Sequence, residues 1–166
     1  MRIELWYANR KASRDMMFGF DWLAKNAGKD AGIAWCPRCQ RLENPGARCE
    51  NPACGERLEP LQVPAPPNPA HLRTTHVKVH TELEMDAVVT EATMRRIAND
   101  LFERFNAGSP RADELALRAV SRLCCHPTNP SSHTSMSVGD VVRFVSDDDC
   151  AVLGALFCDT AGWKKL

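Results

Sequence analysis

The chain has no net charge, no long apolar run and no export signal, and each absence excludes a class of protein. Its 166 residues include 21 basic and 21 acidic side chains, so it lacks the positive charge that draws a domain to nucleic acid or to an anionic membrane surface. No apolar run reaches the roughly 18 to 20 residues that span a bilayer. The N-terminal sequence MRIELWYANRKASRD lacks the apolar core and cleavage site of a signal peptide, so we expect a cytoplasmic location.

Sequence motifs of known catalytic chemistry are also missing. There is no G-x-S-x-G nucleophile elbow, no phosphate-binding P-loop and no H-E-x-x-H metalloprotease motif. The serines between residues 131 and 137 belong to a polar loop, and the acidic run at 147–149 has the composition of a solvated turn. We therefore expect a protein that is not an enzyme.

Eight cysteines are present without an export signal, and a reducing cytosol argues against disulfides among them. Four of the cysteines form two close pairs, in CPRC (Cys36 and Cys39) and in CENPAC (Cys49 and Cys54). Two such pairs on short turns supply the four soft ligands of a closed, tetrahedral zinc site. We expect one structural zinc ion here, in a zinc-ribbon module that is too short to build a sufficient core of its own.

The charges of this module argue against nucleic-acid binding, although many zinc ribbons bind nucleic acid or protein. Its four arginines, at positions 38, 41, 48 and 57, are balanced by four glutamates, at positions 43, 50, 56 and 59. We expect Trp35, just before the first cysteine pair, to pack against the module rather than to stack on a base. A closed four-thiolate site also leaves no open coordination position for catalysis.

The other cysteines do not form a second metal set. Cys124 and Cys125 are adjacent, which prevents good geometry at one ion, and whether they act with His126 and His133 beyond a structural role is left open. Cys150 and Cys158 fall on predicted strands, and we expect them to be buried free thiols.

Three more histidines cluster in the sequence. His76 and His80 lie on one predicted strand at a spacing that points both toward its solvent face. With His71 they could make a weak metal or phosphate contact, but no cysteine or carboxylate at matching spacing supports a site.

The pattern of apolar residues predicts an α+β fold with a small, mostly antiparallel sheet and helices packed on one face. Strands are predicted at residues 3–8, 75–85, 141–145 and 151–158. Helices are predicted to start near Ser13, Thr90 and Ser109. The apolar face of the last of these helices contains Leu115, Ala116, Ala119, Val120 and Leu123. Residues 1–31 and 71–166 form the α+β body, residues 32–60 the inserted zinc-ribbon module, and residues 61–70 a Pro-rich linker.

Two C-terminal phrases resemble a known group of proteins. They are HTSMSVGDVV (His133 to Val142), which contains SMSVGDV, and the ending AGWKKL (Ala161 to Leu166), which contains GWKKL. Together they are similar to the S-x-S-V-G-D-V and G-[W/F]-x-x-[L/I] patterns of small proteins carried by bacterial phages and plasmids, a group that includes YodL-like proteins. The resemblance covers residues 75–166. It implies an accessory protein of a mobile genetic element inside a bacterial host cell, and it transfers no catalytic residue.

These observations lead to three hypotheses. The first is a non-enzymatic phage or plasmid protein with a structural zinc site that binds a host protein, for instance in a defence or regulatory complex. The second is a nucleic-acid-binding regulator that uses the zinc ribbon. The third, an enzyme that uses the loop around His126 and His133, has the least support in the sequence, and no membrane partner is expected.

Overall fold

The computed structural model describes residues 1–9, 12, 15–16, 18–27, 33–39, 41–44, 46–84, 88–124 and 135–166, apart from the side chains of Asp21, Leu123 and Cys124. The chain forms two compact units. The body contains Met1–Met17 and Pro66–Leu166, and the cysteine unit contains Phe18–Ala65. The sequence pattern assigns the first helix to the body, whereas the structure has helix α2 (Phe20–Asn26) in the cysteine unit. The expected cap of that helix, Ser13, lies outside the described residues.

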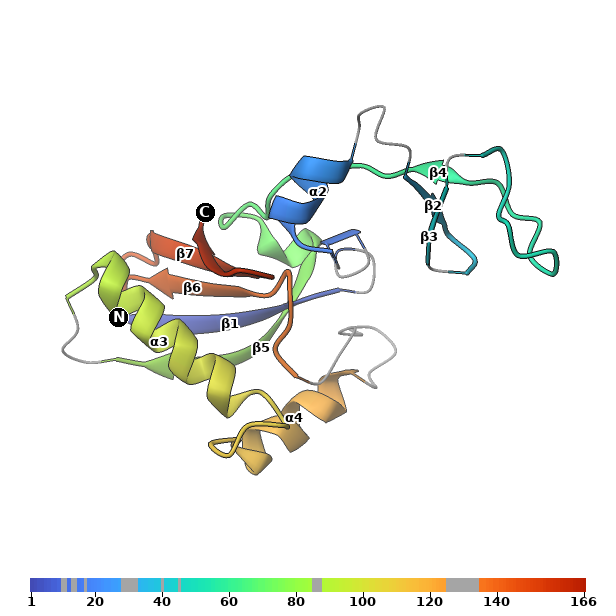
Figure 1. The fold of residues 1–166 in the computed structure, drawn as a ribbon. Helices are drawn as coiled ribbons and strands as arrows, with labels where there is room; N and C mark the ends of the chain where they lie inside the picture. Colours follow the sequence, from blue (N-terminus) through green and yellow to red (C-terminus); the bar gives the residue numbers. More distant parts are fainter. Residues whose placement is uncertain are drawn as a thin grey trace. The chain divides into compact units, whose positions relative to one another are not determined.

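A five-stranded antiparallel sheet forms the frame of the body (Figure 1). Its strands, in spatial order, are β5 (His76–Leu83), β1 (Arg2–Ala8), β6 (Val141–Val145), β7 (Val152–Asp159) and β8 (Gly162–Lys165). Every neighbouring pair is antiparallel. The α+β fold class expected from the sequence is confirmed, and β8 is an additional strand that the sequence pattern does not predict.

Successive side chains of β1 point to opposite faces of this sheet. Ile3, Leu5 and Tyr7 are buried in the main core together with Val142 and Phe144 of β6. Fully burying an aliphatic or aromatic side chain contributes roughly 1.5 to 3 kcal/mol. Strand β1 thus lies inside the sheet, between β5 and β6, with its apolar residues at alternate positions facing the main core.

Helix α3 (Glu91–Arg104) packs on this core and starts where the sequence predicts. Thr90 is the N-cap, and its hydroxyl accepts a hydrogen bond from the Thr93 amide at 3.1 Å, a contact typically worth about 1 kcal/mol. The buried stripe of the helix consists of Met94, Ile97, Ala98 and Leu101. The expected helical periodicity is thus confirmed for this segment.

Helix α4 (Glu114–Cys124) starts later than the sequence predicts. Ser109 forms a turn before the helix, and its hydroxyl accepts the Arg111 amide at 3.2 Å. Asp113 takes the capping role, because its carboxylate accepts the Ala116 amide at 3.0 Å. Leu115, expected in the core, is 78% exposed, so only part of the predicted apolar face of α4 is buried.

The helices of the described part of the chain are short. The longest, α3, has 14 residues. None of them has the length and apolar character that crossing a membrane requires.

Strand β5 contains a bulge that redirects its side chains. Its pairing with β1 shifts by one residue, so that Leu5 lies opposite His80 while Trp6 lies opposite Lys78. An extra residue of this kind reverses the alternation of faces beyond it. His80 consequently lies on the helical side of the sheet, with its ring 4.9 Å from the Phe105 ring.

The bulge corrects two expectations from the sequence. The strand does not keep one apolar face along its length, because Leu83 at its end is 64% exposed. His76 and His80 do not share a solvent face either. His76 is buried, and its Nε2 atom lies 2.8 Å from the carbonyl oxygen of Gly139.

Glu4 is the centre of a polar cluster on the other face of the sheet. Its carboxylate accepts two hydrogen bonds from Arg143, at 2.8 and 2.5 Å, and one from Trp6 at 3.1 Å. Lys78 lies 3.4 Å from the same carboxylate. Arg143 also donates to the carbonyl of Pro69 at 2.9 Å. The cluster therefore joins three strands to the proline-rich segment of the body.

The cysteine unit has a small sheet and an apolar cluster of its own. The sheet consists of β3 (Arg41–Glu43), β2 (Ala34–Cys36) and β4 (Glu59–Pro60), all antiparallel and in that order. The buried residues of the cluster are Leu23, Ala27, Trp35 and Leu61. Trp35 is 7% exposed, which confirms the expectation that it packs against the unit.

Candidate metal centre

The four cysteines singled out by the sequence converge on one point of the cysteine unit. Cys36 ends β2 and Cys39 follows in the next turn, while Cys49 and Cys54 flank a second turn. The Sγ atoms are 3.7 Å apart both for Cys36 with Cys54 and for Cys39 with Cys49. All four sulfurs lie within 4.8 Å of one another.

These separations match the size of a tetrahedral metal–thiolate centre. With metal–sulfur bonds of about 2.3 Å, two sulfurs of a tetrahedron are about 3.8 Å apart. Four thiolates without an oxygen or nitrogen ligand favour soft or borderline metal ions. The donor set therefore fits one metal ion, and all of the ligands come from the cysteine unit.

Two backbone turns hold the sulfurs in place. In the first turn, the Cys39 amide donates to the Cys36 sulfur at 3.3 Å. In the second, the Cys54 amide donates to the carbonyl of Asn51 at 2.9 Å, and Gly55 follows with a φ of 61°. That left-handed conformation favours glycine because other residues have a Cβ. The short spacings in the sequence are therefore the lengths of these turns.

The four thiols are unequal because their surroundings differ. Burial raises the pKa of Cys49 to about 11, and the Glu43 carboxylate acts in the same direction. Burial also opposes ionisation of Cys36, but hydrogen bonds from the Cys39 amide and the Cys49 thiol outweigh it and lower the Cys36 pKa. Cys36 is therefore the easier of the two thiols to ionise when a metal ion approaches.

Two charged residues beside the sulfurs are not identified by the sequence analysis as part of the site. Glu43 Oε1 accepts a hydrogen bond from the Cys49 thiol at 3.1 Å, and its side chain is 2% exposed. Arg41 forms an ion pair with the same oxygen at 2.6 Å. Residues 41 and 43 lie on one face of β3 because strand side chains alternate. This alternation is the only feature of the sequence that predicts an ion pair between Arg41 and Glu43. It does not predict that Glu43 contacts the Cys49 sulfur.

The other arginines of the turns bind the backbone of the same unit. Arg38 donates to the carbonyl of Cys54 at 3.3 Å, and Arg48 donates to the carbonyl of Gly55 at 2.8 Å. Together with Arg41, three of the four arginines near the site are engaged inside the unit. Arg38 links the first cysteine turn to the second, whereas the contact from Arg48 closes the second turn on itself.

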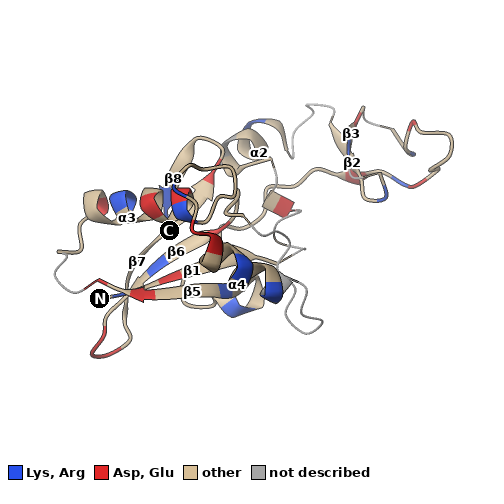
Figure 2. Ribbon diagram, turned by 90° about the horizontal axis from the view of Figure 1, so that it is seen from below, with Lys and Arg blue, Asp and Glu red and all other residues tan. Residues whose placement is uncertain are grey.

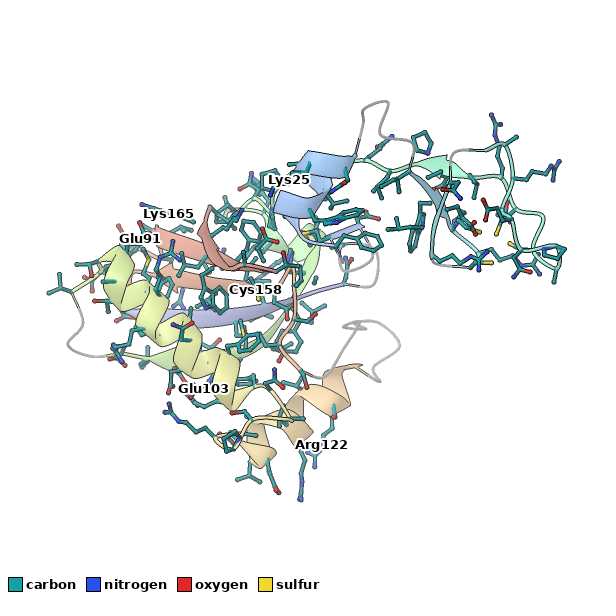
Figure 3. All side chains as sticks on the ribbon, in the orientation of Figure 1. Lys25, Glu91, Glu103, Arg122, Cys158 and Lys165 are labelled. Carbon is teal, nitrogen blue, oxygen red and sulfur yellow. The ribbon has the colours of Figure 1, made fainter. Side chains whose placement is uncertain are left out.

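The remaining cysteines and histidines that the structure describes belong to the body and not to the cysteine unit. Cys158 lies on β7 in the body (Figure 3), where burial raises its pKa to about 12. Cys150 is exposed in the turn before β7, with a φ of 58°, and is not the buried strand residue expected from the sequence. His71 is exposed beside the short 3₁₀ helix Leu72–Thr74. Cys125, His126 and His133 lie outside the described residues, as does the side chain of Cys124.

The SMSVGDV phrase forms a tight turn in the body. Gly139 has a φ of 95°, and a Cβ at this position would lie 2.8 Å from the Met16 Cε atom. Asp140 is buried, and its carboxylate accepts the amides of Ala8 at 2.9 Å and Ser137 at 2.7 Å. The turn fastens the end of β1 to the start of β6, which gives these residues a structural role.

The cysteine cluster is the feature of the described residues that indicates a function most directly. Its geometry alone carries the functional argument. Comparisons with protein-family models, with curated proteins and with solved structures gave no match to this chain.

Proposed function

We propose that the chain is a zinc-binding protein without enzymatic activity, which acts by binding another protein through the cysteine unit. The observation that carries the zinc assignment is the convergence of four cysteine sulfurs at tetrahedral separations. Zinc in such a site has all four coordination positions filled by sulfur. The site is then structural, because no position is left for water or substrate.

Zinc would stabilise the part of the unit that has the smaller apolar cluster. Trp35 and Leu61 belong to a cluster near α2 and β2, whereas the cysteines pack in a smaller cluster whose other buried side chains are Ala34 and Leu58. Binding free energy at such a site is also folding free energy, because the unfolded chain has no preformed site. The metal therefore fixes the shape of the exposed surface around the two turns.

The charges of the unit favour a protein partner over nucleic acid. Residues 18–65 contain six basic and six acidic side chains, and Figure 2 shows both signs on the unit. Three arginines near the site already bind carbonyl or carboxylate oxygens of the unit. Few cations remain to neutralise the phosphates that dominate nucleic-acid affinity.

The resemblance of SMSVGDV and GWKKL to phage and plasmid proteins supports the cellular setting of this proposal. We place the chain among the accessory proteins of mobile genetic elements, in the cytoplasm of a bacterial host. Its partner would be a host protein, for example a component of a defence or regulatory complex.

Fluorescence anisotropy tests the alternative of a nucleic-acid-binding regulator. Labelled duplex DNA, single-stranded DNA and RNA are titrated with the zinc-loaded protein at low salt. We expect no binding at micromolar protein. Tight binding that weakens steeply with salt would overturn the proposal in favour of the alternative.

Cross-linking in a bacterial host lysate tests the protein partner. Lys25 on α2 is exposed and belongs to the cysteine unit, so it can report contacts made there (Figure 3). We expect cross-links from Lys25 to one identified host protein, and we expect the Cys49→Ser variant to lose them. Cross-links that persist in this variant would show that the zinc-bound unit is not the binding surface.

A further inference from the structure

The Glu43 carboxylate lies where a negative charge opposes metal binding. Its Oε1 atom is 3.1 Å from the Cys49 sulfur, and its side chain is 2% exposed. Glu50, the neighbour of Cys49 in the sequence, is exposed and instead accepts a hydrogen bond from Asn44. Between these two carboxylates, only Glu43 is buried against a sulfur ligand.

The contact between Glu43 and Cys49 changes its character when metal binds. As a thiol, Cys49 donates a hydrogen bond to the carboxylate. A metal-bound sulfur is a thiolate, which accepts hydrogen bonds but has no proton to donate. Two anions then face each other at short range in a poorly hydrated place, where charges interact far more strongly than in water.

Arg41 counteracts this repulsion in part. Its guanidinium lies 2.6 Å from Glu43 Oε1, the same oxygen that contacts Cys49. The Arg41 side chain is 50% exposed, so solvent screens its attraction to the buried carboxylate. Compensation of Glu43 is therefore incomplete.

We propose that Glu43 and Arg41 together set the zinc affinity of the site. Glu43 lowers the affinity below that of the four thiolates alone, and Arg41 restores part of it by neutralising Glu43. This inference rests on the zinc site proposed above. Its consequence is a site that releases zinc more readily than four thiolates alone would.

Zinc dissociation constants of the full chain and four variants, measured by competition with a chromophoric chelator, test the proposal. Glu43→Gln removes the charge and offers an N–H to the sulfur, so we expect about tenfold tighter binding, the scale of outer-shell effects. Arg41→Gln leaves Glu43 uncompensated, and we expect about fivefold weaker binding. The double variant should match Glu43→Gln within about twofold, because Arg41 acts through Glu43.

Glu50→Gln is the matched control, since it removes the same charge from an exposed residue next to Cys49. Its constant should stay within about twofold of the unmodified chain. Cobalt(II) spectra of each variant check that four sulfurs still bind the metal. The proposal would be overturned if the zinc dissociation constant of Glu43→Gln were unchanged or larger. It would also be overturned if the cobalt(II) spectrum of Glu43→Gln showed fewer sulfur ligands.

The variants also separate this inference from the zinc site itself. If the unmodified chain binds no zinc, the site and the inference fail together. If it binds zinc but Glu43→Gln and Glu50→Gln behave alike, only the inference fails. If Glu43→Gln does not fold, the Arg41→Gln variant still tests the inference, because we expect it to bind zinc more weakly. An unchanged zinc dissociation constant in Arg41→Gln would contradict the proposed role of the pair.

Discussion

The sulfur atoms of Cys39 and Cys49 lie 3.7 Å apart, although nine residues separate them in the sequence. The sulfurs of Cys36 and Cys54 make the matching contact, which also joins the first cysteine pair to the second. Each contact joins a member of the first pair to a member of the second, so neither pair forms the cluster by itself. Loss of one cysteine should therefore affect the whole cysteine unit rather than a single turn.

The first prediction concerns Cys49→Ser, which leaves three thiolate ligands. A structural zinc site contributes on the order of 10 kcal/mol to the folding of a small module. We expect the variant to lose zinc and the cysteine turns to unfold, while the body keeps its fold because its core is separate. Two-dimensional amide NMR spectra would show collapsed signals for the cysteine unit and preserved signals for the body.

Cys150→Ser is the control for this experiment, because Cys150 is an exposed thiol in the body. It should leave both the zinc content and the spectrum of the cysteine unit unchanged. Unfolding of the body in Cys49→Ser would contradict the independence of the two cores.

The second prediction concerns the ion pair between Arg143 and Glu4. The side chain of Glu4 is 3% exposed and that of Arg143 is 17% exposed. Arg143→Met removes the main partner of a buried carboxylate, which we expect to lower the free energy of unfolding by about 3 kcal/mol. Urea denaturation monitors the change. Arg96→Met, at a residue that is 66% exposed, should cost less than about 0.5 kcal/mol, and equal effects would contradict the cluster's role.

The third prediction is a loss of stability in acid. Burial raises the pKa of Glu4, but the Arg143 hydrogen bonds and charge outweigh it and hold the pKa below its ordinary value of 4.5. In Glu82, the hydrogen bond to His80 lowers the pKa, and Arg104 adds to this effect. A carboxylate with a lowered folded-state pKa contributes stability above its unfolded pKa and loses it as the pH falls.

The corresponding measurement is the free energy of unfolding of the body at several pH values. We expect it to be level near pH 6 and to fall between about pH 4.5 and pH 3. The fall should be smaller in Arg143→Met, because the Glu4 pKa is then no longer held down. An equally steep fall in that variant would show that Glu4 is not responsible.

The fourth prediction concerns the turn at Gly139. Gly139→Ala introduces a Cβ at a φ of 95° and within 2.8 Å of the Met16 Cε atom. We expect a loss of about 1 to 3 kcal/mol in the free energy of unfolding, mainly from backbone strain, with a smaller contribution from crowding because the end of the flexible Met16 side chain can move. Gly162→Ala provides the comparison, since its φ is 103° but no atom lies near the added Cβ. Thermal unfolding should show the smaller loss for Gly162→Ala, and the reverse order would contradict the tight contact with Met16.

Features determined by local sequence could be predicted well. The start of α3 follows from the Thr90 side chain and a regular stripe of apolar residues. The cysteine pairs are recognisable because thiolate ligands on tight turns require short spacings. In both cases the residues that decide the structure are close together in the chain.

Features determined by distant contacts could not be predicted from the pattern. The bulge in β5 depends on its pairing with β1, and no local signal shows that Leu5 lies opposite His80. The start of α4 is fixed in part by the Asp113 amide, which donates to the carbonyl of Arg104 in another helix at 2.8 Å. Glu43 meets Cys49 only after the turns between them have folded.

Metal analysis of the purified protein tests the central claim most directly. The chain is expressed in zinc-supplemented medium and purified without chelators, and its metal content is measured by mass spectrometry against protein concentration. We predict about one zinc ion per chain, lost in Cys49→Ser and kept in Cys150→Ser. Unmodified protein that contains no zinc would contradict the account.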